Sequence, residues 1–193
     1  HPSRCKTLHT RKFWALTGYF SYLKADGLAV AEGPTDGPAQ PLFTGEEASI
    51  AKAVPKRRQE FSIARSLARK AMTELGYPQT AVPARPDRSP QWPPGLTGSI
   101  THTGDWCAVA IGTAASGILS LGIDLEPLAP LPEDLVAAIC SDVELRQLDS
   151  KPAAMQSIFA RVIFSAKESI YKAQYPLSGR FLDMNDIGVN LDE

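Results

Sequence analysis

Two acidic residues close together in an apolar segment could bind a metal ion. Asp124 and Glu126 belong to the segment Gly122-Ile-Asp-Leu-Glu126. In a strand, alternation would send both carboxylates to one face and Ile123 and Leu125 to the other. The two charges repel each other unless a hard divalent cation such as Mg²⁺ or Mn²⁺, which prefers oxygen ligands, neutralises them. On spacing alone, a solvated strand end is the commoner explanation of such a pair.

A second set of polar and ionisable side chains repeats at helical spacing later in the chain. One face of the helix predicted from residue 153 to 175 carries Arg161, Ser165, Glu168 and Lys172. Acids and bases that alternate on a helix are ordinarily a solvated surface with weak ion pairs. Glu168 would nevertheless supply a third carboxylate to a cation held by the acidic pair.

Basic residues gather at the start of an earlier helix, predicted from residue 56 to 75. The run Lys56-Arg-Arg58 opens it, and seven residues later Arg65 returns to the same face. Arginine side chains and helix N-termini both suit phosphate oxygens, although a charged run on a helix is more often a solvated face. His102 ends a predicted strand, where a structural hydrogen bond is its commoner role.

The hydrophobic pattern predicts the elements of the first half of the chain. Thr44-Gly-Glu-Glu47 has the spacing of a capping box, Pro55 interrupts the helical stretch that follows, and Gly76 caps the helix at 56–75. Residues 33–41 are rich in Gly and Pro and predict a surface loop. The buried stripe of the helix is predicted to consist of Phe61, Ala64, Ala68, Ala71 and Leu75.

Strands and further helices are predicted downstream. Segments 98–102 and 106–111 flank a turn in which Gly104 takes the left-handed position, the pattern of a hairpin. Residues 118–126 predict another strand. A capping box at Ser141 predicts a short helix, and Pro176 is expected to stop the long one. The inward face of that long helix is predicted to consist of Ile158, Val162, Ala166, Ile170 and Ala173. Mixed helices and adjacent strands predict an α+β fold of two lobes, with a boundary near residues 116–120.

Composition narrows the classes of function. The 193 residues carry 20 Lys and Arg against 21 Asp and Glu, so no overall positive charge favours nucleic acid. No apolar run approaches the roughly 20 residues that span a bilayer, which predicts a soluble protein without a membrane partner. The cysteines are odd in number and widely spaced, which predicts a reducing, cytoplasmic setting. Because the sequence begins at His1 and stops just after the strand-like segment 187–191, we expect it to be part of a longer chain.

Four sequence blocks stand in a characteristic order between residues 56 and 172. They are Lys56-Arg-Arg-Gln-Glu-Phe-Ser-Ile-Ala-Arg65, Gln91-Trp-Pro-Pro-Gly-Leu-Thr-Gly-Ser-Ile-Thr-His102, Gly122-Ile-Asp-Leu-Glu126 and Phe164-Ser-Ala-Lys-Glu-Ser-Ile-Tyr-Lys172. Together they resemble the 4′-phosphopantetheinyl transferase superfamily, specifically its Sfp-like, enterobactin-type branch. The ordered set outweighs the solvated-surface interpretations given above.

The resemblance implies a fold and a reaction. The fold would be two similar lobes related by pseudo-twofold symmetry, each a small antiparallel sheet packed with a long helix. The reaction would move the 4′-phosphopantetheine group of coenzyme A to a serine of an apo acyl, peptidyl or aryl carrier protein, releasing 3′,5′-ADP. Residues 1–118 would form the N-terminal lobe, which binds the nucleotide of coenzyme A. Residues 119–193 would form a C-terminal lobe that holds the metal-binding acids and the catalytic helix and continues beyond Glu193.

The resemblance also assigns roles to individual residues. Asp124, Glu126 and Glu168 would hold Mg²⁺, with Mn²⁺ as an alternative, together with pyrophosphate oxygens of coenzyme A. Glu168 would act as general base and Lys172 would stabilise the phosphoryl charge, so these two are the implied catalytic residues. The implied coenzyme A ligands are Arg57, Arg58, Arg65, Arg88, Ser99, Thr101, His102, Lys167 and Lys172. Among them, His102 would contact the 3′-phosphate, and Arg88 stands near a position where many members carry lysine.

Two other functions stay open at this point. A regulatory or degenerate module would bind coenzyme A without transferring anything, and a metal-dependent phosphohydrolase would use the same acids to activate water. The complete set of three acids and Lys172 argues against pure binding. The spacing does not encode whether the carrier serves fatty-acid, polyketide, nonribosomal peptide or siderophore synthesis, and internal duplication would make a monomer sufficient.

Overall fold

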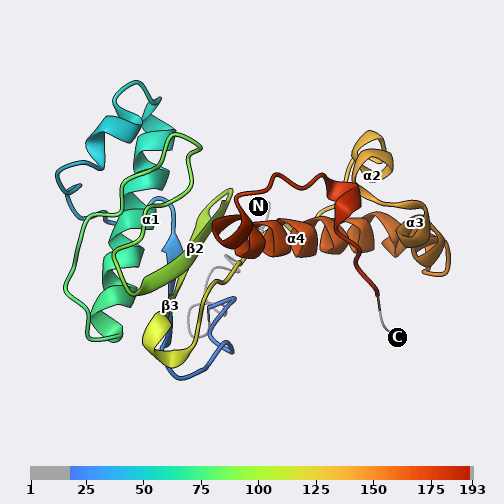
Figure 1. Ribbon diagram of the computed structural model, residues 1–193. Coiled ribbons are helices and arrows are strands. Elements are labelled where there is room, and N and C mark those ends of the chain that lie inside the picture. Colours follow the sequence, from blue (N-terminus) through green and yellow to red (C-terminus); the bar gives the residue numbers. More distant parts are fainter. Residues whose placement is uncertain (1–17, 192–193) are drawn as a thin grey trace, which may run out of the picture.

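The α+β prediction is confirmed by the structure, a computed structural model that describes residues 18–191. In chain order its elements are β1 (Leu28–Pro34), a 3₁₀ turn (Glu47–Ile50), α1 (Pro55–Glu74), β2 (Leu96–Thr103), β3 (Trp106–Thr113), a 3₁₀ turn (Ala114–Ser116), α2 (Glu133–Ile139), α3 (Asp142–Asp149), α4 (Ala153–Ser178) and a 3₁₀ turn (Met184–Asp186). Figure 1 shows α1 against the sheet, while α4 runs away from the sheet with α2 and α3 at its far end. The C-terminal part of α4 therefore lies beside the sheet.

The strands form one antiparallel sheet in the order β1-β3-β2, with β3 in the centre. The predicted hairpin is confirmed, because β2 pairs with β3 and Gly104 adopts a left-handed φ of 43° in the turn between them. The sequence pattern does not predict β1, since its last residues, Gly33 and Pro34, are typical of a loop. Pro34 is tolerated because β1 is an edge strand.

Helix α1 covers the sheet with nearly the stripe that the sequence predicts. Four of its five predicted residues are buried and Leu75 is partly buried, the buried ones being Phe61, Ala64, Ala68 and Ala71. Ala68 and Ala71 share a core cluster with Val109 and Ile111 of β3. Small side chains on the helix allow it to pack closely on the central strand.

The capping box predicted at Thr44 is wrong. The 3₁₀ turn begins only at Glu47, and its N-cap residue Glu46 makes no side-chain cap bond. The Glu46 carboxylate points inward, where it pairs with Arg69 at 3.0 Å and accepts from the backbone N–H of Val82 at 2.8 Å. Both charged side chains are fully buried, so this ion pair anchors the loop that leads into the basic start of α1.

The strand predicted at 118–126 is also wrong, since these residues have no regular secondary structure. Side chains satisfy their amides: Ile123 donates to Ser99 Oγ at 3.1 Å, and Leu125 donates to Thr101 Oγ1 at 3.0 Å. The hydroxyl groups of β2, rather than its backbone, are the acceptors. The segment therefore lies against β2 without extending the ladder.

Helix α4 differs from its prediction in length and in orientation. Pro176 does not stop it, because a missing N–H in the last turn removes only one bond, and the helix ends at Ser178 with Gly179 at a φ of 62°. Its buried residues are Ala160, Ile163 and Lys167 rather than the predicted apolar stripe. Val162 is 49% exposed and Ile170 is 42% exposed. The helical half packs around Ile163 instead, with Leu131, Ile139, Cys140 and Leu148 as its neighbours.

The second half of the described chain holds helices and no strand between residues 119 and 191, so the second sheet and the pseudo-twofold relation remain predictions. The capping box at Ser141 is confirmed at the start of α3. Cys107 and Cys140 are free and buried, and Cys5 lies outside the described residues. None of the helices within residues 18–191 combines the length and apolar character needed to cross a bilayer.

Candidate functional site

The segment that carries the predicted acidic pair is held between β2 and α4. Gly122 permits this position, because a Cβ there would overlap the backbone carbonyl of Ser169 and crowd the backbone N of Ala173. Ile123 and Leu125 pack on the same apolar cluster, beside Phe20 and residues of β3. The prediction that the apolar and acidic residues face opposite ways is therefore confirmed even though no strand forms.

Asp124 is nearly buried and asymmetrically bonded. Its Oδ1 accepts from Lys172 Nζ at 2.6 Å and from the Thr101 hydroxyl at 3.2 Å. Its Oδ2 is buried and has no hydrogen-bond partner, the only such side-chain atom among residues 18–191. A buried carboxylate oxygen without a partner is unfavourable unless a proton or a cation binds there.

Glu126 forms an ion pair with Arg161 of α4, at 2.7 Å. Arg161 also donates to the backbone carbonyls of Ala129 and Pro130. The guanidinium group therefore fixes both the acid and the chain that follows it. The sequence pattern placed Arg161 on the charged face of α4 but gave it no partner.

Glu168 of α4 interacts electrostatically with members of both ion pairs. Burial raises the pKa of its carboxyl above the usual value, and the negative charges of Asp124 and Glu126 add to this effect while Lys172 opposes it. The three predicted acids thus interact with one another. Within the described residues, however, no three acidic, histidine or cysteine side chains are arranged closely enough to hold a metal ion as they stand.

Cationic groups neutralise the acids in this arrangement. Lys172 is bound to Asp124 and Arg161 to Glu126, which explains how two carboxylates can lie close together without an ion. The donor set still fits a hard cation, because oxygen ligands select Mg²⁺ or Mn²⁺ and Asp124 Oδ2 is already free of other bonds. A cavity of about 430 Å³ is lined by Asp124 and Glu126 together with residues of α4.

Arg57 and His102 meet at the end of the sheet nearest the start of α1. Arg57 Nη1 lies 2.9 Å from His102 Nε2, so a neutral imidazole accepts from the guanidinium group. Partial burial lowers the pKa of His102, and the charges of Arg57 and Lys172 lower it further while Glu60 opposes them. Lys172 therefore acts electrostatically on both His102 and the acids. The exposed Lys56 and Arg57 make this surface basic, although Glu60 pairs with Arg57 at 3.5 Å.

Several residues assigned by resemblance lie elsewhere or are engaged differently. Arg65 is 5% exposed, stacks on Phe61 and donates to the carbonyl of Val82 at 2.6 Å, so its guanidinium group stabilises the core. Burial lowers its pKa to about 10. Arg58 is exposed, but it donates to carbonyls in the loop before α1. The hydroxyls of Ser99 and Thr101 bind the 123–125 segment.

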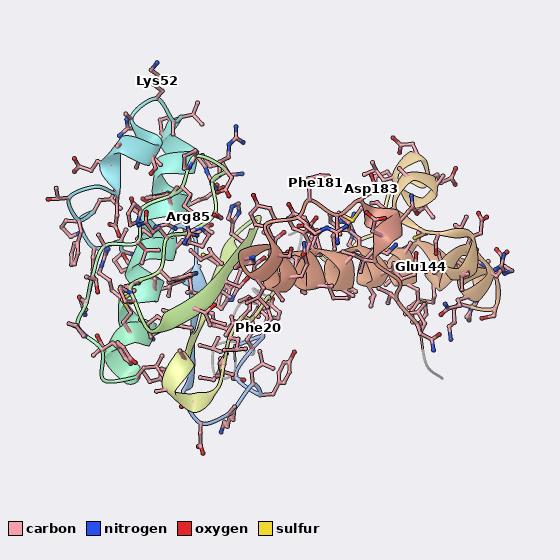
Figure 2. All side chains as sticks on the ribbon, in the orientation of Figure 1. Phe20, Lys52, Arg85, Glu144, Phe181 and Asp183 are labelled. Carbon is pink, nitrogen blue, oxygen red and sulfur yellow. The ribbon has the colours of Figure 1, made fainter. Side chains whose placement is uncertain are left out.

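Lys167 is the clearest departure. Its ammonium group is fully buried, 2.7 Å from Glu144 of α3, and it also donates to the carbonyls of Ile139 and Met184. Figure 2 shows Glu144 at the end of α4 remote from the sheet. Lys167 thus joins α4 to the other helices and is not brought to the acids. Arg88 lies in the loop before β2 at a left-handed φ of 70°.

One contact between the two halves has no signal in the sequence. Tyr175 of α4 donates its hydroxyl to Asp87 at 3.0 Å, in the same loop as Arg88. Asp87 also accepts from the backbone and the side chain of Ser89. This contact ties the proline-rich loop to the C-terminal part of α4, on the side of the helix that carries Lys172.

Comparison with known proteins adds independent information. A family model described as the 4′-phosphopantetheinyl transferase N-terminal domain matches residues 45–112. A second, described as the 4′-phosphopantetheinyl transferase superfamily, matches residues 120–193. Residues 113–119, which connect the sheet to the acidic segment, separate the two matches.

Curated relatives match over most of the chain. The 4′-phosphopantetheinyl transferase Svp of Streptomyces mobaraensis is 38% identical over 182 residues, covering 93% of this chain and 69% of the relative. The 4′-phosphopantetheinyl transferase Npt of Nocardia iowensis is 37% identical, covering 83% of this chain and 70% of the relative. Enterobactin synthase component D of Escherichia coli O157:H7 is 33% identical, covering 77% and 70% respectively.

Proposed function

The chain belongs to the 4′-phosphopantetheinyl transferase superfamily, which includes the enterobactin-type branch, and from this membership we propose the reaction that it catalyses. It transfers the 4′-phosphopantetheine group of coenzyme A to a serine of an apo carrier protein, leaving 3′,5′-ADP. The observation that carries the proposal is the joint placement of Asp124, Glu126, Glu168 and Lys172 beside the pair of Arg57 and His102. An acidic site for a cation and a basic surface for phosphates are both needed to hold coenzyme A at its pyrophosphate.

We propose that Asp124, Glu126 and Glu168 hold Mg²⁺, with Mn²⁺ as an alternative. The partnerless Oδ2 of Asp124 and the mutual repulsion that helps raise the pKa of Glu168 support this assignment. When bound, the cation would withdraw charge from the pyrophosphate oxygens and so stabilise the charge that builds up in transfer.

In the transfer step, residues of the chain itself accept the proton of the carrier serine and stabilise the charge on the phosphoryl group. The carrier serine oxygen attacks the phosphorus that bears the pantetheine arm, and the bond from this phosphorus to the oxygen of 3′,5′-ADP breaks. Glu168 accepts the serine proton, a role for which a carboxyl of raised pKa is suited. The electron pair leaves with 3′,5′-ADP. Lys172, whose ammonium group already binds one carboxylate of the site, stabilises the phosphoryl oxygens.

The nucleotide part of coenzyme A is proposed to bind at the basic surface. Arg57 and His102 are the pair best placed for the 3′-phosphate, since their side chains meet and both are accessible. Arg58 and Arg88, which are also exposed, would contribute positive charge around them. The buried Arg65 and Lys167 stabilise the fold and are left out of the proposed ligand set.

The remaining features of the proposal concern the protein as a whole. Residues 1–118 form the nucleotide-binding lobe and residues 119–193 belong to the metal-binding lobe, in a pseudo-twofold arrangement. The protein acts as a monomer in the cytoplasm. The similarity to an enterobactin synthase component makes a carrier of nonribosomal peptide or siderophore synthesis the first to test.

Chromatography of the reaction products tests the reaction class. Coenzyme A is incubated with the protein and Mg²⁺, with and without an apo carrier, and 3′,5′-ADP is quantified. Transfer predicts that 3′,5′-ADP appears only with the carrier and in equal molar amount to modified carrier. Release without a carrier would favour a phosphohydrolase, whereas coenzyme A binding without release, across fatty-acid, polyketide and peptide carriers, would favour a binding module.

A further inference from the structure

We propose that Thr101 is a positioning residue for the metal site, whose hydroxyl orients the carboxylate of Asp124 and keeps one of its oxygens free for the cation. This inference rests on the proposed function and adds a role that the resemblance does not supply. The resemblance implies that the chain near Thr101 lines the nucleotide of coenzyme A. The structure directs its hydroxyl away from that surface and into the contact between β2 and the acidic segment.

The partners of the Thr101 hydroxyl show which of its hydrogen bonds it donates and which it accepts. A threonine hydroxyl has one proton and two lone pairs. Thr101 Oγ1 accepts from the backbone N–H of Leu125 at 3.0 Å, which leaves its proton to donate to Asp124 Oδ1 at 3.2 Å. Thr101 is 3% exposed, so water does not compete for these bonds. The hydroxyl thus couples the backbone position of the segment to the orientation of its carboxylate.

The bonds of Asp124 fall on one oxygen only. Thr101 and Lys172 both donate to Oδ1, and Oδ2 is left buried without a partner. The side chain of Asp124 is 6% exposed, so Oδ2 cannot be satisfied by bulk water. Two donors on Oδ1 resist rotation of the carboxylate, which would exchange the oxygens. The free oxygen is therefore held as a ligand position at a cost in stability that a cation would offset.

Ser99 provides the comparison within the same strand. It lies two residues before Thr101, is equally buried, and accepts from the backbone N–H of Ile123 at 3.1 Å. It touches no carboxylate, so it fixes the backbone of the segment but not the acid. Alternate residues of β2 thus hold alternate amides of the segment, and only Thr101 extends this contact to a proposed metal ligand.

The experiment compares variants that keep or remove the hydroxyl. Thr101→Val keeps the shape and loses both hydrogen bonds, Thr101→Ser keeps both, and Thr101→Ala serves if the valine variant does not fold. The matched control is Thr113→Val on β3, a buried threonine whose hydroxyl bonds Ser116 at 3.0 Å, outside the site. Mn²⁺ affinity is measured by electron paramagnetic resonance with coenzyme A present. Coenzyme A affinity is measured by calorimetry in EDTA, and exchange of the Leu125 amide by NMR.

We expect Thr101→Val to weaken Mn²⁺ binding by about 10–100-fold, as loss of a residue that orients a metal ligand does. The serine variant and the Thr113→Val control should bind Mn²⁺ as the wild type does. Coenzyme A affinity in EDTA should be equal in all of them. The Leu125 amide should exchange faster only where the hydroxyl at 101 is absent.

Two results would overturn the inference while leaving transfer intact. Unchanged Mn²⁺ affinity in Thr101→Val would show that the hydroxyl does not position Asp124. Weaker coenzyme A binding in EDTA would show that Thr101 acts on the nucleotide. A wild-type protein that binds no Mn²⁺ beside coenzyme A and modifies no carrier would instead refute the proposed function, and the inference with it.

Discussion

Lys172 Nζ lies 2.6 Å from Asp124 Oδ1 and so joins α4 to the acidic segment beside the sheet. The Asp124 side chain is 6% exposed and that of Lys172 is 28% exposed, which places the pair at the boundary between core and solvent. The same two residues are proposed to bind the cation and the phosphoryl group. Stability and the proposed catalysis therefore share one ion pair, and variants of it should separate the two contributions.

Replacing Lys172 by Met should destabilise the protein, because it leaves a buried carboxylate without its countercharge. We expect the free energy of unfolding to fall by about 1–3 kcal/mol. The double variant Asp124→Asn/Lys172→Met should recover most of that loss and still transfer nothing. Urea denaturation and a carrier-modification assay measure the two effects. If the double variant is no more stable than the single one, the pair does not contribute as described.

Gly122 should be intolerant of even a methyl group. A Cβ at this position would overlap the carbonyl of Ser169, which is helix backbone and cannot move aside. Gly122→Ala should lower the free energy of unfolding by about 1–3 kcal/mol, as overpacking does, and should also reduce transfer by displacing Asp124. Gly33→Ala is the matched control, since nothing lies within 4 Å of a Cβ there. Equal stability of the two variants would argue against close contact between the segment and α4.

Lys167 and Arg57 should behave in opposite ways. Lys167→Met removes one partner of a fully buried ion pair and should cost about 3–5 kcal/mol of stability. Adding Glu144→Gln should restore part of this, and the folded fraction should bind coenzyme A normally. Arg57→Met should leave stability nearly unchanged and weaken coenzyme A binding. Thermal unfolding and calorimetry compare them; a specific loss of coenzyme A affinity in folded Lys167→Met would return Lys167 to the ligand set.

His102 should titrate below its usual pKa of 6.5, because partial burial and the charge of Arg57 both favour the neutral ring. The unfolded chain then binds more protons than the folded one between the lowered pKa and 6.5. The contribution of His102 to the free energy of unfolding therefore has its full value above pH 6.5. It decreases as the pH falls from 6.5 through the lowered pKa. His102→Gln should remove that fall.

NMR of the His102 ring protons measures the titration directly. Arg57→Met should raise the pKa of His102, since a nearby positive charge is lost. Binding of 3′,5′-ADP should also raise it, because a phosphate group favours the protonated ring. A His102 pKa that does not respond to 3′,5′-ADP would place the nucleotide elsewhere.

Local sequence patterns predicted much of this fold and the residue types of the site. The hairpin, the stripe of α1 and the cap of α3 follow from glycine placement, helical period and a Ser-x-x-Glu motif, all of which act over a few residues. The opposite facing of Asp124 and Ile123 also followed from alternation. These features depend on local geometry, which residues close together in the sequence determine.

The wrong predictions concern features that depend on contacts with residues distant in the sequence. The period of α4 could not say which of its faces would be covered, and the other helices cover the side of Ile163 and Lys167. Residues 118–126 have a strand-like composition, but side-chain hydroxyls took the place of backbone partners. Arg65 has the spacing of a phosphate ligand, but it is buried, and its guanidinium group donates a hydrogen bond to the carbonyl of Val82, 17 residues further along the chain.

Intact-mass spectrometry of an apo carrier protein tests the central claim most directly. The carrier is incubated with coenzyme A, Mg²⁺ and either the wild-type protein or Glu168→Gln, with EDTA and Thr113→Val as controls. We expect the carrier to gain the mass of one phosphopantetheine group on its serine with the wild type and with Thr113→Val. The gain should be absent with EDTA and with a folded Glu168→Gln variant. Full modification by Glu168→Gln, or undiminished modification in EDTA, would contradict the proposed site.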